Sequence, residues 1–262
     1  MKSARQLDRS GRRLTFEDTF DGEALDGRRW IPAYLPQWST PDRTRARYEL
    51  RDGTLRLRID ADQPPWCPEL DGDLRVSSIQ TATFSGPLGS PVGTHPFHPA
   101  ARVRTPQPER RLYTPQGGLI EVRMRALDDP RVMVALWMIG IGDVPDRSGE
   151  ICVAEIFGRN VRDGRARVGM GIHPFRDPAL TDDFEEVELE LDVRDWHTWS
   201  ADWRSDRVDW FVDDRHVRTV EQSPRYPLQL MLGIYELPGD EADARPESND
   251  LKVFEIDFVR GS

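Results

Sequence analysis

The chain has 262 residues, a length that fits one large β-sandwich or two small domains and is sufficient to bury a core. Its 36 Lys and Arg residues against 46 Asp and Glu residues give a net charge of -10, which argues against nucleic acid or an anionic membrane surface as a partner. Cys67 and Cys152 are too few for a disulfide framework or a cysteine-based zinc site.

The first 13 residues are polar and rich in arginine, and they lack the apolar stretch of a secretory signal. We therefore expect a flexible N-terminal segment over residues 1–13 and a single domain over residues 14–262, acting as a monomer. No later run is apolar for long enough to cross a membrane. A complete chain would then be cytoplasmic, whereas a chain whose leader had been removed would be secreted.

Short runs that alternate apolar and polar residues follow, separated by Gly, Pro and Asp, and they favour an all-β sandwich or jelly roll. The first clear example joins residues 47–51 to residues 54–59 through Asp52 and Gly53, which is typical of a hairpin. Further predicted strands cover residues 75–83, 120–125, 133–139, 149–157, 186–193, 196–203, 207–213, 228–235 and 251–259.

A Pro-rich stretch over residues 86–116 shows little strand pattern and contains His95 and His98. It is too long for an ordinary connection between strands. We expect a loop that packs along one rim of the sandwich.

Two glutamates, Glu150 and Glu155, stand within an otherwise apolar predicted strand. Carboxylates buried in a strand require a functional or structural explanation. In a regular strand residues five apart point to opposite faces, so the pair could cooperate only if a β-bulge inserts one residue between them. Without a bulge, the two glutamates would be a structural feature only.

The run from Glu150 through Cys152 to Glu155 resembles the centre of glycoside hydrolase family 16, the laminarinase and lichenase group, which reads Glu, apolar, Asp, apolar, any residue, Glu. Further blocks similar to the family occur in order at residues 16–20, 25, 30, 118–125, 134–138, 196–203, 210–213 and 257–260. The resemblance implies a concanavalin A-like jelly roll of two curved antiparallel sheets, with an oligo- or polysaccharide bound across the concave face.

The resemblance also implies retaining hydrolysis of a β-glucan with β-1,3 or mixed linkages by an endo-β-glucanase. Glu150 would attack the anomeric carbon, and Glu155 would protonate the leaving oxygen and then activate water. These roles require Glu150 to be ionised and Glu155 to be protonated in the resting enzyme.

Cys152 is a departure from the family pattern, because an aspartate usually stands between the two glutamates. A thiol is a weak hydrogen-bond donor and cannot supply the charge of a carboxylate, so we expect reduced activity. Two alternatives stay open: a non-catalytic glycan-binding module with a degenerate active site, and a transglycosylase.

Candidate substrate contacts are aromatic side chains that could stack on sugars and polar groups near the predicted cleft. They are Trp137, His173, Tyr34, Trp38, Tyr235 and Glu236. Core packing explains Trp137 nearly as well, and a surface position would equally explain His173.

We expect no cofactor and assign no metal ligands, although members of the family often hold a structural calcium. Asp257 and the carbonyl of Gly53 would suit that ion, which prefers oxygen ligands. Thr19, however, replaces an acidic residue that is often found at the site.

Overall fold

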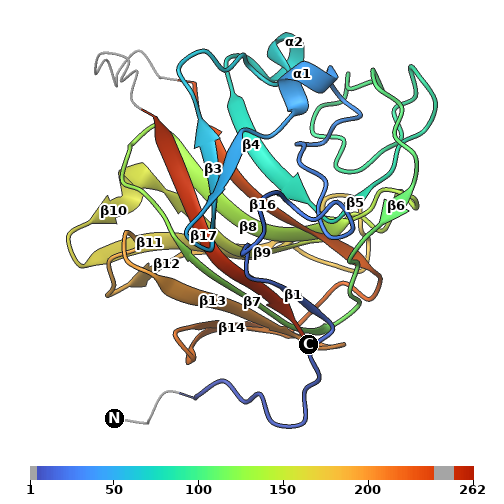
Figure 1. Ribbon diagram of the computed structural model, residues 1–262. Coiled ribbons are helices and arrows are strands. Elements are labelled where there is room, and N and C mark those ends of the chain that lie inside the picture. The colour runs from blue at the N-terminus through green and yellow to red at the C-terminus, as the bar shows by residue number, and fades with distance from the viewer. Residues whose placement is uncertain (1–4, 239–250) are drawn as a thin grey trace.

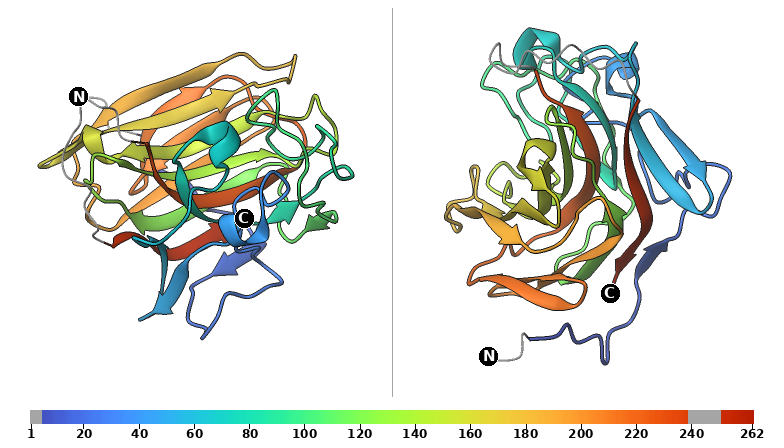
Figure 2. Two further views of the ribbon diagram at one scale, coloured as in Figure 1. Left: turned by 90° about the horizontal axis from the view of Figure 1, so that it is seen from above. Right: turned by 90° about the vertical axis from the view of Figure 1, so that its left-hand side faces the viewer.

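The computed structural model describes residues 5–238 and 251–262, which form two large antiparallel sheets packed face to face (Figures 1 and 2). The eight-stranded sheet has the order β15 (Arg215–Val220), β14 (Val208–Val212), β13 (His197–Trp203), β7 (Gly118–Arg125), β17 (Lys252–Gly261), β3 (Thr54–Ile59) and β2 (Tyr48–Arg51), and β1 (Phe16–Asp18) pairs with β17.

The seven-stranded sheet has the order β10 (Val161–Arg162), β11 (Arg165–His173), β9 (Glu150–Phe157), β8 (Val132–Gly140), β16 (Leu228–Glu236) and β4 (Arg75–Gln80), and β12 (Asp183–Leu189) pairs with β11. The short strands β5 (Ala82–Thr83) and β6 (Arg110–Arg111) form a separate pair. The helical elements are α1 (Pro41–Thr44), α2 (Pro68–Asp71) and the 3-10 turn η1 (Gly158–Asn160). The two sheets make the jelly-roll sandwich that the sequence predicts.

The pattern of each strand reflects which of its faces is covered. In β3, Leu55, Leu57 and Ile59 are buried between the sheets, while Arg56 and Arg58 are half-buried on the outer face. The strands β8, β9 and β16 are apolar almost throughout, because the main core covers one face and other residues cover the second. These three strands form the middle of the seven-stranded sheet.

A second apolar cluster covers the face of the seven-stranded sheet that is turned away from the main core. Tyr34, Trp66 and Val103 reach it from loops, and Trp137 and Tyr235 reach it from β8 and β16. The predicted loop over residues 86–116 is largely irregular, as expected, and Val103 anchors it here. The loop therefore forms part of the surroundings of this face.

The predicted strands are confirmed, with ends that differ by a few residues, although residues 75–83 are divided between β4 and β5. The short strands β6 and β10 and the longer strands β11 and β15 were missed. β11 contains Gly169 and Gly171, which weaken the strand pattern, and Gly171 has a φ of 150°. β15 is mostly half-buried and lacks a clear apolar face. Both strands are specified more by their neighbours than by their own residues.

The N-terminal segment that the sequence predicts to be flexible contacts the eight-stranded sheet in its described part. Leu7 is buried beside Leu119 and Phe211, and Gln6 forms an isolated bridge with Arg215. Residues 1–4 lie outside the described residues. No helix in the described ranges is long and apolar enough to cross a membrane.

Candidate active site

The centre of the site is a β-bulge in β9. On the β8 side, Leu136 pairs with Ala154 but the next residue, Trp137, pairs with Cys152, so Val153 is an extra residue. Pairing with β11 shifts over the same interval. Because of the bulge, two side chains that a regular strand would direct to opposite faces point to the same face. It therefore meets the condition under which Glu150 and Glu155 can cooperate.

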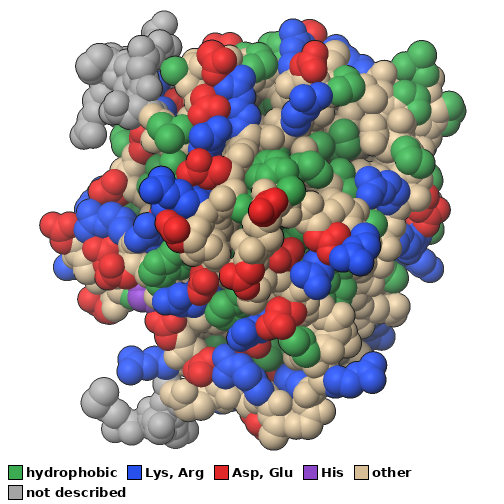
Figure 3. Space-filling view, viewed as in Figure 1, with side chains coloured by type: hydrophobic (Ala, Val, Ile, Leu, Met, Phe, Trp, Pro, Cys, Tyr) green, Lys and Arg blue, Asp and Glu red, His purple; other side chains and the backbone are tan. Residues whose placement is uncertain are grey.

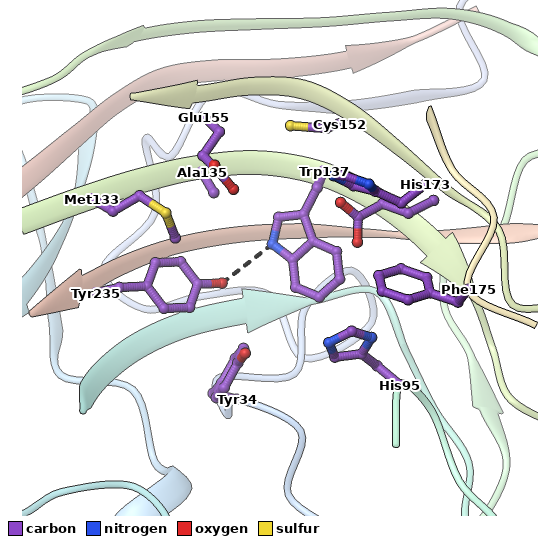
Figure 4. A pocket seen from close by; sticks show the side chains of 11 residues that line it. Tyr34, His95, Met133, Ala135, Trp137, Cys152, Glu155, His173, Phe175 and Tyr235 are labelled. Atoms are coloured by element: carbon purple, nitrogen blue, oxygen red, sulfur yellow. Dashed lines mark hydrogen bonds between the residues drawn. The ribbon is translucent and has the colours of Figure 1, made fainter. Parts of the chain in front are cut away.

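A cavity of about 270 Å³ lies over this bulge, and both glutamates line it. Figure 4 shows this cavity and labels Glu155. The other lining residues are Tyr34, His95, Met133, Ala135, Trp137, Cys152, His173, Phe175 and Tyr235. The structure thus gathers seven predicted site residues around one space, from β8, β9, β11, β16 and the loop before α1.

Glu150 is almost fully buried, and burial together with the nearby Glu155 raises its pKa to about 8. No hydrogen bond or ion pair holds its carboxyl group within the described part of the chain. The raised pKa disfavours the ionised form that the sequence predicts for Glu150, because no donor or cation compensates for the loss of water.

Glu155 also has a raised pKa, chiefly because of burial. The positive charge of His173 opposes that rise, and the negative charge of Glu186 adds to it. Two neighbouring carboxyl groups with raised pKa values titrate as a pair, and their combined behaviour governs the chemistry. Such a pair can hold one proton and one negative charge.

His173 lies at the end of β11, directly across from Glu150 in the strand pairing. Its Nδ1 lies 2.7 Å from an oxygen of Asp182, and its ring stacks on Phe184 at 4.6 Å between centroids. These contacts fix the ring at the wall of the cavity. His173 therefore lines the cavity and does not lie only on the outer surface.

Cys152 lies between the glutamates and is buried. Its thiol donates to the carbonyl of Gly169 at 3.6 Å, so it gives no hydrogen bond to Glu150. Burial raises the pKa of the thiol well above its usual range. Cys152 and Cys67 are both free thiols. The thiol therefore does not replace the aspartate of the family pattern.

Aromatic residues form the floor of the cavity beside the glutamates. The indole N–H of Trp137 donates to the hydroxyl of Tyr235 at 3.2 Å, shown as the dashed line in Figure 4. The ring of Tyr34 meets that of Tyr235 edge-on at 5.4 Å. This arrangement presents flat apolar surfaces together with hydroxyl groups, the combination that suits a sugar.

Two predicted substrate contacts do not line the cavity. Trp38 is 1% exposed, and its indole N–H donates to the carbonyl of Thr94 at 2.8 Å, so it supports the loop from within. Glu236 is 6% exposed and pairs with arginine and with Lys252, at 3.0 Å in the latter case. Both predictions are corrected, because long-range contacts bury these residues.

Sequence reasoning missed His95 and Phe175, which meet edge-on at 4.9 Å on the cavity wall. Each has a left-handed backbone, with φ of 45° for His95 and 46° for Phe175. Burial and the positive charges of Arg176 and His173 lower the pKa of His95 to about 4. The only signal in the sequence was the unusual length of the loop that carries His95.

One residue considered for calcium, Asp257, has another partner in the structure. The carboxylate of Asp257 is bound by the guanidinium of Arg123 and is therefore engaged. Among residues 5–238 and 251–262, no group of three or more His, Cys, Asp or Glu side chains could hold a metal ion.

Solved structures share this fold over nearly the whole chain. An endo-β-galactosidase from Clostridium perfringens that releases GlcNAcα1-4Gal is 25% identical with a TM-score of 0.81, covering 98% of this chain and 64% of that chain. This chain thus spans less than two thirds of that protein.

A laminarinase from Flavobacterium sp. UMI-01 is 18% identical with a TM-score of 0.63, covering 95% of this chain and 99% of that one. A β-glucanase from Bacillus licheniformis is 15% identical with a TM-score of 0.63, covering 94% and 97%. At these identities the likeness shows the fold alone.

No curated protein matches the chain. The model of the glycosyl hydrolases family 16 matches residues 113–258, which include β7 to β16 and the whole of β9. This match covers more than half of the sequence and includes both glutamates. The chain belongs to glycosyl hydrolases family 16.

Proposed function

We propose that the protein is a retaining endo-glycosidase in which Glu150 is the nucleophile and Glu155 is the acid and base. The observation that carries the proposal is the bulge at Val153, which brings both glutamates to one cavity. Retaining glycosidases require two carboxyl groups that flank the scissile bond at a separation of about 5–5.5 Å. Aromatic residues beside the pair supply a surface for a sugar ring.

In the first step the carboxylate of Glu150 attacks the anomeric carbon while Glu155 gives its proton to the leaving oxygen. A covalent glycosyl-enzyme results. Glu155 then takes a proton from water, and the water displaces Glu150. Transfer to a second sugar in place of water would use the same intermediate, so transglycosylation is an alternative outcome of the same site.

The reaction requires the form of the pair in which Glu150 carries the charge and Glu155 carries the proton. Because the pKa of Glu150 is raised to about 8, this form is scarce at neutral pH. The absence of a donor at Cys152 accounts for this, since a hydrogen bond to the ionised form lowers a carboxyl pKa. The ratio of the two singly protonated forms does not depend on pH, so we expect modest turnover that falls as the pH rises past about 8, where the pair loses the proton that Glu155 must donate.

For the substrate, we propose a glycan with β-galactoside linkages as the first candidate and a β-glucan as the second. The Cys152 variant of the motif departs from the pattern on which the β-glucan prediction rests. The endo-β-galactosidase has a TM-score of 0.81 with this chain, against 0.63 for the laminarinase. This difference supports the galactoside.

A glycan-binding module without turnover is the second candidate function. It is favoured by one observation, the lack of any hydrogen bond to the Glu150 carboxyl within the described ranges. Without ionisation of Glu150, the cavity could still hold a sugar.

The test is the release of reducing ends from β-galactan, from glycans ending in GlcNAcα1-4Gal, from laminarin and from mixed-linkage β-glucan. The native chain should act on at least one substrate, and both Glu150→Gln and Glu155→Gln should abolish release. Glu190→Gln is the matched control, because Glu190 is exposed and lies after β12. Binding without release in the native chain would overturn the hydrolase and favour the module, and longer products would indicate transfer.

A further inference from the structure

A second cavity of about 200 Å³ adjoins the one over the glutamates, and His95 and Phe175 line both. Its other lining residues are Gly93, Pro96, Ile139, Gly140, Gly142, Ser148 and Arg176. The pair formed by His95 and Phe175 is thus a partition within one longer cleft. Figure 4 shows both rings beside Trp137.

The backbone of the partition is strained. Non-glycine residues with positive φ are uncommon, and for a bulky residue such as Phe175 this conformation is an outlier. The Phe175 side chain is 49% exposed despite its position between two cavities. Strained residues of this kind occur at ligand sites, where the surrounding structure holds a side chain in place for contact.

Arg176 gives the second cavity its charge. Its backbone N–H donates to the hydroxyl of Ser148 at 2.8 Å, which fixes the start of the side chain. Within the part of the chain that the structure describes, no carboxylate pairs with its guanidinium. A cation at the cleft wall without such a partner is available to a ligand.

The groups next to Arg176 are neutral or have other partners. His95 is neutral above pH 5, because its pKa is lowered to about 4. Asp177 follows Arg176 in the chain, but its carboxylate accepts the hydroxyl of Tyr226 at 2.5 Å and lines a different cavity. Glu150 is in the first cavity and is mainly neutral below pH 8.

We propose that the second cavity is a glycan subsite for a sugar that carries a sulfate or a carboxylate, with the anionic group on Arg176 and the ring against Phe175. A planar guanidinium binds such groups through two parallel hydrogen bonds. The neutral imidazole of His95 adds one donor and one acceptor for sugar hydroxyls. The inference rests on the proposed function only in taking the cleft to bind glycans.

The test is calorimetric binding of galactose, galactose 6-sulfate, galacturonate and inorganic sulfate. The native chain should bind one of the anionic sugars at least tenfold more tightly than galactose, and the preferred one identifies the group. Arg176→Gln should remove this preference and leave galactose binding unchanged. Phe175→Ala should weaken binding of all three sugars.

Arg225→Gln is the matched control, because Arg225 is an exposed arginine in a separate cavity. It should leave every affinity unchanged. Equal binding of neutral and anionic sugars by the native chain would overturn the inference, as would a preference that survives Arg176→Gln. If inorganic sulfate bound as tightly as galactose 6-sulfate and Phe175→Ala had no effect on binding, the cavity would be a simple anion site. That result would also overturn the inference. If the anionic sugar bound through Arg176 but no reducing ends were released from any glycan, only the proposed hydrolase would be contradicted.

Discussion

Glu150 combines deep burial with the absence of a hydrogen bond to its carboxyl in the described structure. Its pKa is about 8 in the folded chain against an ordinary value of 4.5. The folded state therefore disfavours the charge that the reaction needs. This residue links catalysis and stability, because ionisation that enables attack also costs folding free energy.

The stability of the native chain should fall as the pH rises from about 4.5 to about 8 relative to Glu150→Gln. Below that window Glu150 is neutral in both states, and within it only the unfolded chain ionises. The loss is about 1.4 kcal/mol for each pH unit between the two pKa values. Melting temperatures measured across this range should show a widening gap that levels above pH 8. A constant gap would contradict the raised pKa, and Glu190→Gln should follow the native curve.

Cys152→Asp should raise kcat/KM and move the acidic limb of its pH profile to lower pH. Burial keeps the new carboxyl protonated, so it can donate to Glu150 and stabilise the charged form. A hydrogen bond to a charged group is worth about 1.5–3 kcal/mol, or roughly ten- to a hundredfold in rate. The control is Cys152→Ala, which should stay near native activity because the thiol bonds only to Gly169. Equal rates for the two variants would remove the role given to the missing aspartate.

At the scale of the elements, the bulged strand β9 depends on its neighbours. The indole N–H of Trp210 in β14 donates to the carbonyl of Cys152 at 3.0 Å, joining the two sheets next to the bulge. On the other side, Gly169 in β11 lies opposite Glu155. The direction of the glutamates is thus set jointly by three strands.

Gly169→Ala should lower both activity and stability. The added Cβ would lie 2.4 Å from the ring of Phe184 and 3.2 Å from Cβ of Glu155, so Phe184 must shift and disturb His173, on which it stacks. Overpacking of this kind costs about 1–3 kcal/mol, and misplacement by about 1 Å can lower a rate on the order of a hundredfold. Gly27→Ala, whose Cβ would meet no atom within 4 Å, should change neither melting temperature nor kcat. Native behaviour of Gly169→Ala would show that the packing around Glu155 does not set its position.

Most strands could be predicted because the alternation of apolar and polar residues is a local pattern, as in β3. The bulge could be predicted only as a condition that had to hold if Glu150 and Glu155 were to cooperate. Whether Trp38 faced a sugar or a core could not be predicted, since its burial depends on Thr94 in a distant loop. His95 and Phe175 were missed for a related reason. They lie in irregular segments, where no periodicity indicates which side chains will face a cavity.

At the scale of the whole molecule, acidic and basic side chains are interspersed over the face shown in Figure 3. On the eight-stranded sheet, for example, Arg56 lies between Glu49 and Glu255. The N-terminal segment adds a separate ion pair, in which Arg5 bonds the buried carboxylate of Asp209 at 2.8 Å. The segment therefore contributes to stability on the sheet opposite to the candidate active site.

Arg5→Gln should lower the melting temperature and leave activity unchanged. The pKa of Asp209 is held well below its usual range, although burial opposes this, because Arg5, Thr219 and Arg207 bond to its carboxylate. Each hydrogen bond to such a charge is worth about 1.5–3 kcal/mol, and the other two partners limit the loss. Arg13→Gln, at an exposed position, serves as the control and should melt like the native chain. A variant at Arg5 that melts like the native chain would show that the segment only rests on the sheet.

The central claim is that Glu150 forms a covalent bond to the sugar, and trapping that intermediate tests it most directly. The native chain is incubated at pH 8 with activated 2-deoxy-2-fluoro β-galactoside and β-glucoside, and its mass is measured before and after digestion. The mechanism predicts one added glycosyl group on the peptide that contains Glu150, and none in Glu150→Gln. An adduct on another residue, or turnover of the natural substrate without any adduct, would contradict it.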